Sequence, residues 1–163
     1  MAKLTQSITY TIEELRAMVI RVNRSSGEKS KPITFFNEKP VHEITDLNIL
    51  PGEVFREGTT NHNNYSFEVK VSNFGRVIYK GEVITQREKD DESDGYLVLD
   101  KAESGLTGKL VYQIVADVWL DKPSDRDVKI RHHITNNGYD NRPENLMWVT
   151  AEEDKLIHAG ANW

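Results

Sequence analysis

The chain has 163 residues, no cysteine, 29% charged and 37% apolar residues, and a formal net charge of -5. A chain of this length buries one hydrophobic core with at most a small appendage. The absence of cysteine excludes disulfides and favours a cytoplasmic setting. No apolar run reaches the length of a membrane span, and the first residues lack the apolar stretch of a signal peptide. The acidic balance predicts weak non-specific binding to DNA.

Residues 1–58 form the first predicted region, and the sequence leaves its role open. Thr11 and Glu14 make a capping box, which predicts a helix through about Asn23. Apolar residues recur at helical spacing along it and are expected to pack on the core; they are Ile12, Leu15, Val19 and Val22. Residues 58–64 are polar and rich in turn formers, which predicts a boundary there.

Residues 59–106 form the second predicted region, a small antiparallel β-sheet. Every second residue from position 65 to position 71 is apolar, the pattern of a half-buried strand. The run Ser72–Gly75 predicts a turn, after which the chain returns as a hairpin. A further strand is predicted at Gly95–Leu99.

Residues 107–163 are the third predicted region, a helix followed by a strand–loop–strand–helix unit. Apolar spacing predicts the first helix at Lys109–Trp119. The strands are predicted at Lys129–Ile134 and Leu146–Val149, and a capping box at Thr150 begins the last helix. The fold class predicted for the whole chain is therefore α+β. It has an N-terminal helical segment, a small antiparallel β region and a C-terminal ββα unit.

Four side chains in this last unit indicate a metal site. His132 and His133 are adjacent on a strand, so their rings point to opposite sides of it. Asp154 and His158 are four residues apart on a helix and share one face. Two imidazoles and a carboxylate can hold a divalent metal, and the remaining histidine suits a general base. The alternative is an exposed pair on each element; a structural zinc site is less favoured because the chain has no cysteine.

The unit resembles the HNH endonuclease motif of the ββα-metal type. The residues that carry the resemblance are His132, His133, the run Asp140–Thr150, Asp154 and His158. Upstream, Phe67–Val77 resembles the "YEVSNxGRV" element that often precedes HNH motifs in phage and homing endonucleases. Leu110–Trp119 resembles the segment that links the two, with Tyr112 where that segment usually has histidine. The similarity covers about Tyr65 to Ala159 and implies a bacterial or phage-encoded protein.

The resemblance implies a metal-dependent DNA endonuclease. The catalytic residues would be His133, as general base, and Asn145, which matches the asparagine that ties the loop to the strand. The metal ligands would be His132, Asp154 and His158, although a carboxylate at position 154 is uncommon in the family. Magnesium or manganese is the expected ion, with zinc or nickel as alternatives.

DNA is the expected partner, and six basic residues are predicted to contact it. They are Lys70, Arg76 and Lys80 in the upstream hairpin, and Arg131, Arg142 and Lys155 near the metal site. For the last three, solvated surface charge is an equally good reading. The rival function is a catalytically weak or inactive DNA-binding or interaction protein that uses the ββα unit as a scaffold.

Overall fold

The computed structural model describes residues 4–5, 31–89, 95–100, 105–122, 124, 127–135 and 137–158. The helix predicted from Thr11 to about Asn23 lies outside these residues. None of the helices in the described part is long and apolar enough to cross a bilayer.

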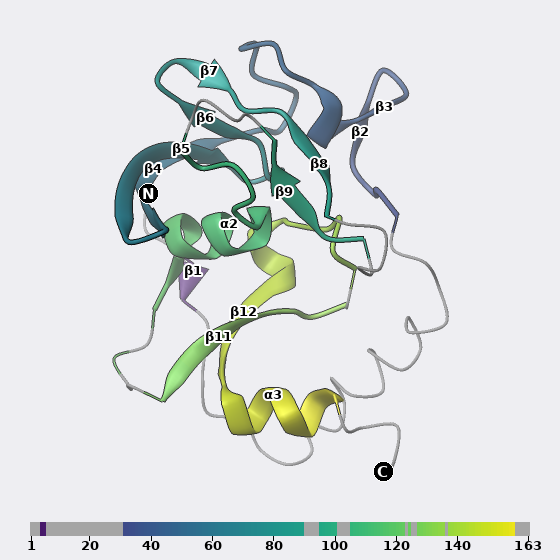
Figure 1. The fold of residues 1–163 in the computed structure, drawn as a ribbon. Coiled ribbons are helices and arrows are strands. Elements are labelled where there is room, and N and C mark those ends of the chain that lie inside the picture. Colours follow the sequence, from purple (N-terminus) through teal and green to yellow (C-terminus); the bar gives the residue numbers. More distant parts are fainter. Residues whose placement is uncertain are drawn as a thin grey trace.

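The largest sheet of the described residues is a four-stranded antiparallel one whose strands follow one another in chain order (Figure 1). Its strands are β4 (Phe55–His62), β5 (Tyr65–Ser72), β6 (Val77–Tyr79) and β7 (Glu82–Val83). The turn between β4 and β5 consists of Asn63 and Asn64, both with positive φ. Asparagine tolerates this backbone region, and two such residues match the twist of a tight hairpin. The strand β4 therefore covers most of residues 58–64, the stretch predicted to separate the first two regions. It begins before position 58, where the first predicted region ends.

Four further sheets of the described residues have two strands each. Three are antiparallel, and they pair β2 (Phe35–Phe36) with β3 (Lys39–Pro40), β8 (Gln86–Glu88) with β9 (Leu97–Leu99), and β11 (Val128–His133) with β12 (Leu146–Thr150). The fourth pairs β1 (Leu4–Thr5) in parallel with β10 (Leu120–Asp121). The helices in the described part of the chain are the α-helices α2 (Val111–Trp119) and α3 (Ala151–His158) and the 3-10 helices η1 (Val41–Glu43) and η3 (Pro143–Asn145).

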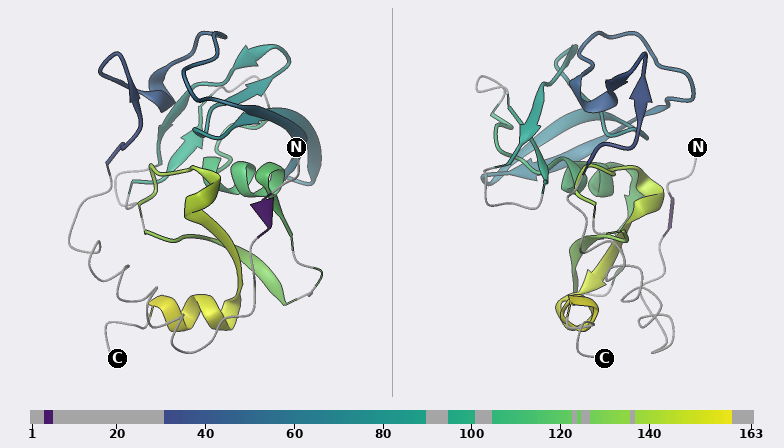
Figure 2. Two further views of the ribbon diagram at one scale, coloured as in Figure 1. Left: turned by 180° about the vertical axis from the view of Figure 1, so that it is seen from behind. Right: turned by 90° about the vertical axis from the view of Figure 1, so that its right-hand side faces the viewer.

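The helix α2 lies at the centre of the molecule. The four-stranded sheet packs on one side of it and the β11–β12 pair on the other, with α3 at the far end (Figures 1 and 2). Its buried residues Ile114, Val115 and Val118 share one core with Val71 of β5 and Leu146 of β12. The helix lies where the apolar spacing predicts it. Apolar residues that recur every three to four positions form a continuous apolar surface on a helix, and in α2 these residues are buried.

The predicted fold class is wrong. The described residues are mostly β-strands, divided among five sheets, and their two α-helices have only nine and eight residues. The longer of the two, α2, lies in the second half of the chain, and the predicted N-terminal helical segment lies outside the described residues. Because α2 contacts both the four-stranded sheet and the β11–β12 pair, one core joins the predicted β region to the predicted C-terminal unit. Periodicity reports which face of an element is buried, but it does not report which distant element covers that face.

Two loops meet closely at Gly138. A Cβ atom there would lie 2.7 Å from the carbonyl oxygen of Gly95 and 3.0 Å from Cα of Tyr96. Both neighbours are backbone atoms, which cannot rotate out of the way. We expect Gly138→Ala to lower the free energy of unfolding by about 1–3 kcal/mol. Thermal unfolding of the variant and the parent protein measures this, and equal melting temperatures would contradict it.

Candidate nuclease site

The candidate site is a hollow of about 200 Å³ between α2, β11 and α3. It is lined by Tyr96, Tyr112, Ile130, Arg131, His132, His133 and Asp154. The predicted capping box positions α3: the Glu153 N–H donates to Thr150 Oγ1 over 3.0 Å, and the Thr150 N–H donates to Glu153 Oε1 over 2.9 Å. These bonds begin the helix directly after β12. As a result Asp154, in the first turn of α3, lies against β11.

The His133 side chain is buried, with only 4% of the residue's surface exposed. Its ring centre lies 4.5 Å from that of Tyr112 and 5.7 Å from that of Tyr96. Burial lowers the pKa of His133 from 6.5 to about 4, although Asn141 and Asp140 act in the opposite direction. The imidazole is therefore neutral near pH 7, the state in which it can accept a proton.

Two asparagines hold the loop that follows β11. Asn145 Oδ1 accepts a hydrogen bond from the backbone N–H of Thr135, and Asn145 Nδ2 donates to the carbonyl oxygen of Asp140. Asn145 therefore ties the loop to the strand, as the resemblance implies. The residue in contact with His133 is Asn141, whose Oδ1 lies 2.8 Å from His133 Nε2. Asn141 was missed in the sequence because it is one of several asparagines in a turn-rich loop, where a turn-forming role explains it equally well.

Two of the three predicted metal ligands come together in the structure. His132 Nδ1 lies 3.6 Å from Asp154 Oδ1, and both residues line the hollow beside His133. Atoms that ligate one ion at about 2.1 Å each lie about 3 Å apart, so this pair needs only a small adjustment to share a divalent cation. The side chain of the third ligand, His158, lies outside the described part. Among the described side chains, no three His, Asp or Glu residues are grouped so that together they could hold one metal ion.

Arg131 is the one predicted DNA contact that lines the hollow. Lys155 is exposed on α3. Arg142 donates to both carboxylate oxygens of Asp140, over 2.7 and 3.0 Å, and these hydrogen bonds raise its pKa. Its guanidinium therefore already serves a structural purpose in the loop after β11.

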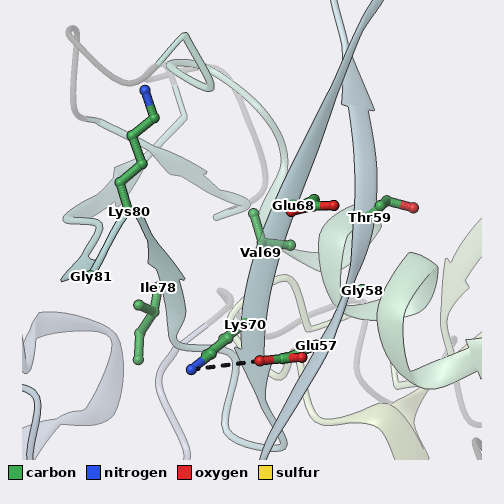
Figure 3. A pocket seen from close by; sticks show the side chains of 9 residues that line it. All are labelled: Glu57, Gly58, Thr59, Glu68, Val69, Lys70, Ile78, Lys80 and Gly81. Atoms are coloured by element: carbon green, nitrogen blue, oxygen red, sulfur yellow. Dashed lines mark ion pairs between the residues drawn. The ribbon is translucent and has the colours of Figure 1, made fainter.

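Lys70 and Lys80 lie elsewhere, at a larger hollow of about 490 Å³ on the four-stranded sheet (Figure 3). The strand neighbours of Lys70, Val69 and Val71, are buried in the core with α2, so alternation directs Lys70 to the opposite face. The same hollow is lined by Glu57 and Glu68, and Lys70 Nζ lies 3.7 Å from Glu57 Oε1. The two lysines are thus separated from the hollow that contains His133. Their contact with DNA stays a prediction.

Arg76 is buried, and this burial disagrees with its predicted contact with DNA. Only 1% of its surface is exposed, and its Nη2 lies 2.6 Å from Glu53 Oε1. Nη2 also donates to the carbonyl oxygen of Asn48, Nε donates to Glu53 Oε2, and Nη1 donates to the carbonyl oxygens of Ile44 and Asp46. A cation with its donors already occupied inside the protein cannot reach a phosphate. Arg76 instead fixes the 44–53 loop to the turn between β5 and β6.

The chain is similar to one curated protein, which is named an uncharacterized HNH endonuclease, from Acanthamoeba polyphaga mimivirus. The two are 32% identical over 94 residues, which cover 56% of this chain and 23% of the viral protein. The chain therefore spans about a quarter of the length of that relative. No family model matches the chain, and no solved structure matches it.

Proposed function

We propose that the chain is a metal-dependent DNA endonuclease of HNH type. The observation that carries this proposal is the meeting of His132, His133 and Asp154 in one hollow, at the positions that the motif assigns to ligand, base and ligand. The similarity to a viral protein named as an HNH endonuclease supports the same activity. The substrate is the phosphodiester backbone of DNA.

His133 acts as the general base. As Asn141 Oδ1 only accepts hydrogen bonds, His133 Nε2 carries the hydrogen between them and Nδ1 keeps its lone pair. Nδ1 takes a proton from a water molecule as the water oxygen attacks phosphorus. The bond from phosphorus to the 3′ oxygen breaks, and that oxygen takes a proton from solvent. The products carry a 5′-phosphate and a 3′-hydroxyl. Asn141 and the rings of Tyr96 and Tyr112 orient the base.

His132, Asp154 and His158 would hold the divalent ion. When bound, it supplies positive charge that stabilises the negative charge growing on the phosphate and on the 3′ oxygen. Nicking of a supercoiled plasmid, with and without divalent metal, tests the proposal. Nicking that requires the metal supports it. DNA binding without nicking in any metal would support the rival function, a catalytically weak or inactive DNA-binding or interaction protein that uses β11, β12 and α3 as a scaffold.

The mixed ligand set leads to a prediction about metal preference. Imidazole nitrogen suits zinc and nickel, whereas a carboxylate suits magnesium and manganese. We expect magnesium or manganese to support nicking, because three protein ligands on a six-coordinate ion leave places for phosphate oxygens and water. We expect excess zinc to inhibit. Asp154→Asn should lower the rate in magnesium more than in manganese, because it removes the anionic ligand, and Asp154→His should shift the preference toward zinc and nickel.

The measurement is the nicking rate of the parent protein and both variants across a series of divalent metals. Glu152→Gln is the matched control, because it removes a carboxylate from an exposed position on the same helical turn. Identical metal profiles for the parent protein and both Asp154 variants would show that Asp154 is not a ligand.

A further inference from the structure

Arg131 precedes the two histidines on β11, and its guanidinium is held from two directions. Its Nε and Nη2 donate to a single oxygen, Asp117 Oδ1, over 3.1 and 2.7 Å. Its Cζ lies 4.7 Å from the ring centre of Trp148, the directly opposite residue on β12. A guanidinium with a carboxylate at its edge and an aromatic ring beside it has little rotational freedom.

Asp117 is itself held in place. It lies on α2, and its second oxygen, Oδ2, accepts a hydrogen bond of 2.8 Å from the Thr60 hydroxyl. Thr60 is on β4 and only 1% exposed, so this bond lies at the edge of the core. Arg131 is thereby connected to the centre of the molecule through Asp117, and its orientation does not depend on its own flexible chain.

This arrangement leaves one donor nitrogen available. Within the described part of the chain, Nη1 of Arg131 has no hydrogen-bond acceptor, whereas Nε and Nη2 are occupied by Asp117. The side chain is 20% exposed, and the residue lines the hollow that contains His132, His133 and Asp154. Arg131 therefore borders a polar hollow while one of its charged donor nitrogens is not occupied by Asp117.

A second basic side chain, that of Lys109, lies near Arg131. Lys109 is buried, and burial is the largest cause that lowers the pKa of its amine. The positive charge of the nearby Arg131 guanidinium lowers the pKa of Lys109 further. Asp117 is one negative group beside these two basic ones, and it acts on Lys109 in the opposite direction. Lys109 therefore adds a second basic group beside the Arg131–Asp117 pair, at the edge of a site that has to accept a phosphodiester.

We infer that Arg131 is a pre-oriented phosphate receptor of this site and that Asp117 is the positioning residue that sets its direction. The inference rests on the proposed function, because it specifies how the DNA backbone is held beside His133. Arg131 donates Nη1 to a backbone phosphate, and Asp117 prevents the guanidinium from turning away. Thr60 and Trp148 complete the support.

The first test observes Arg131 directly and does not require cleavage. Arginine Nε–Hε resonances are recorded by NMR with EDTA present, and a short DNA duplex is added. We expect Arg131, assigned by its loss in Arg131→Lys, to give a sharp signal that shifts with DNA. Arg76 is the matched control, because a carboxylate also holds it but it is buried, so its signal should not move. An Arg131 signal that DNA leaves unchanged, or that exchanges too fast to be seen in the free protein, overturns the inference.

The second test separates positioning from general stability. We expect Asp117→Asn to broaden the Arg131 signal and to lower the nicking rate at saturating DNA about tenfold. The DNA concentration for half-maximal rate should change less than threefold, because the positive charge remains. Thr60→Val, which keeps the carboxylate, should give a smaller loss of the same kind. In an Arg131→Ala background, Asp117→Asn should cause no further loss; an equal loss in both backgrounds overturns the inference.

The two proposals fail in different ways. If DNA shifts the Arg131 signal but no metal supports nicking, the proposed nuclease function fails and the phosphate receptor stands. If the protein nicks DNA while the Arg131 signal does not respond, the nuclease function stands and the receptor fails.

Discussion

Replacing His133 with alanine is expected to lower the rate of plasmid nicking by at least about a hundredfold, the lower end of the range for loss of a general base. The physical reason is that His133, the proposed base, is buried, contacts Asn141 and is neutral near pH 7, so that its imidazole can accept a proton from water. Manganese affinity, measured by calorimetry, should change little because the ligands remain.

The controls for this experiment concern folding and location. The alanine variant leaves a cavity beside Tyr112, so His133→Gln, which fills more of the space, should show the same loss of nicking while melting closer to the parent protein. His62→Ala is the matched histidine control; its ring lies on β4 against the carbonyl of Thr107. It should nick at the parental rate. If His133→Ala abolished metal binding and His132→Ala left it intact, the roles of the two histidines would be reversed.

Glu53→Gln is expected to cause the largest loss of stability, about 3–5 kcal/mol in the free energy of unfolding. The Glu53 and Arg76 side chains are 0% and 1% exposed, and the variant leaves the Arg76 cation in the interior without its counter-charge. Urea denaturation measures the change. The loop from Ile44 to Asn48, whose carbonyl oxygens accept from Arg76, should lose hydrogen-exchange protection first.

Glu57→Gln provides the matched control. It removes the carboxylate that faces Lys70, but in that pair the side chains are 55% and 80% exposed. Water and salt screen the interaction, so the loss should be less than about 1 kcal/mol. Equal losses for the Glu53 and Glu57 variants would mean that burial does not strengthen the Arg76 pair, and its structural role would have to be withdrawn.

Local sequence determined several elements of this protein. The capping box of Thr150 and Glu153 begins α3, the apolar spacing before Trp119 forms α2, and the alternation after Tyr65 forms β5. Each of these elements depends on interactions between residues at most a few positions apart. A short stretch of sequence therefore contains the residues that cause the element to form. The approach of Asp154 to His132 also follows from local elements, because a short helix begins directly after the strand that pairs with β11.

The tertiary structure decided which charges face solvent and which elements share a core. Arg76 and Lys70 look alike in the sequence, yet one is buried against Glu53, 23 residues away, and the other lies on an open sheet face. Arg131 is oriented by Asp117 of α2, which is in turn held by Thr60, 57 residues away on β4. The cost of removing a charge from water depends on partners that the whole fold assembles, and no pattern within a short window reports them.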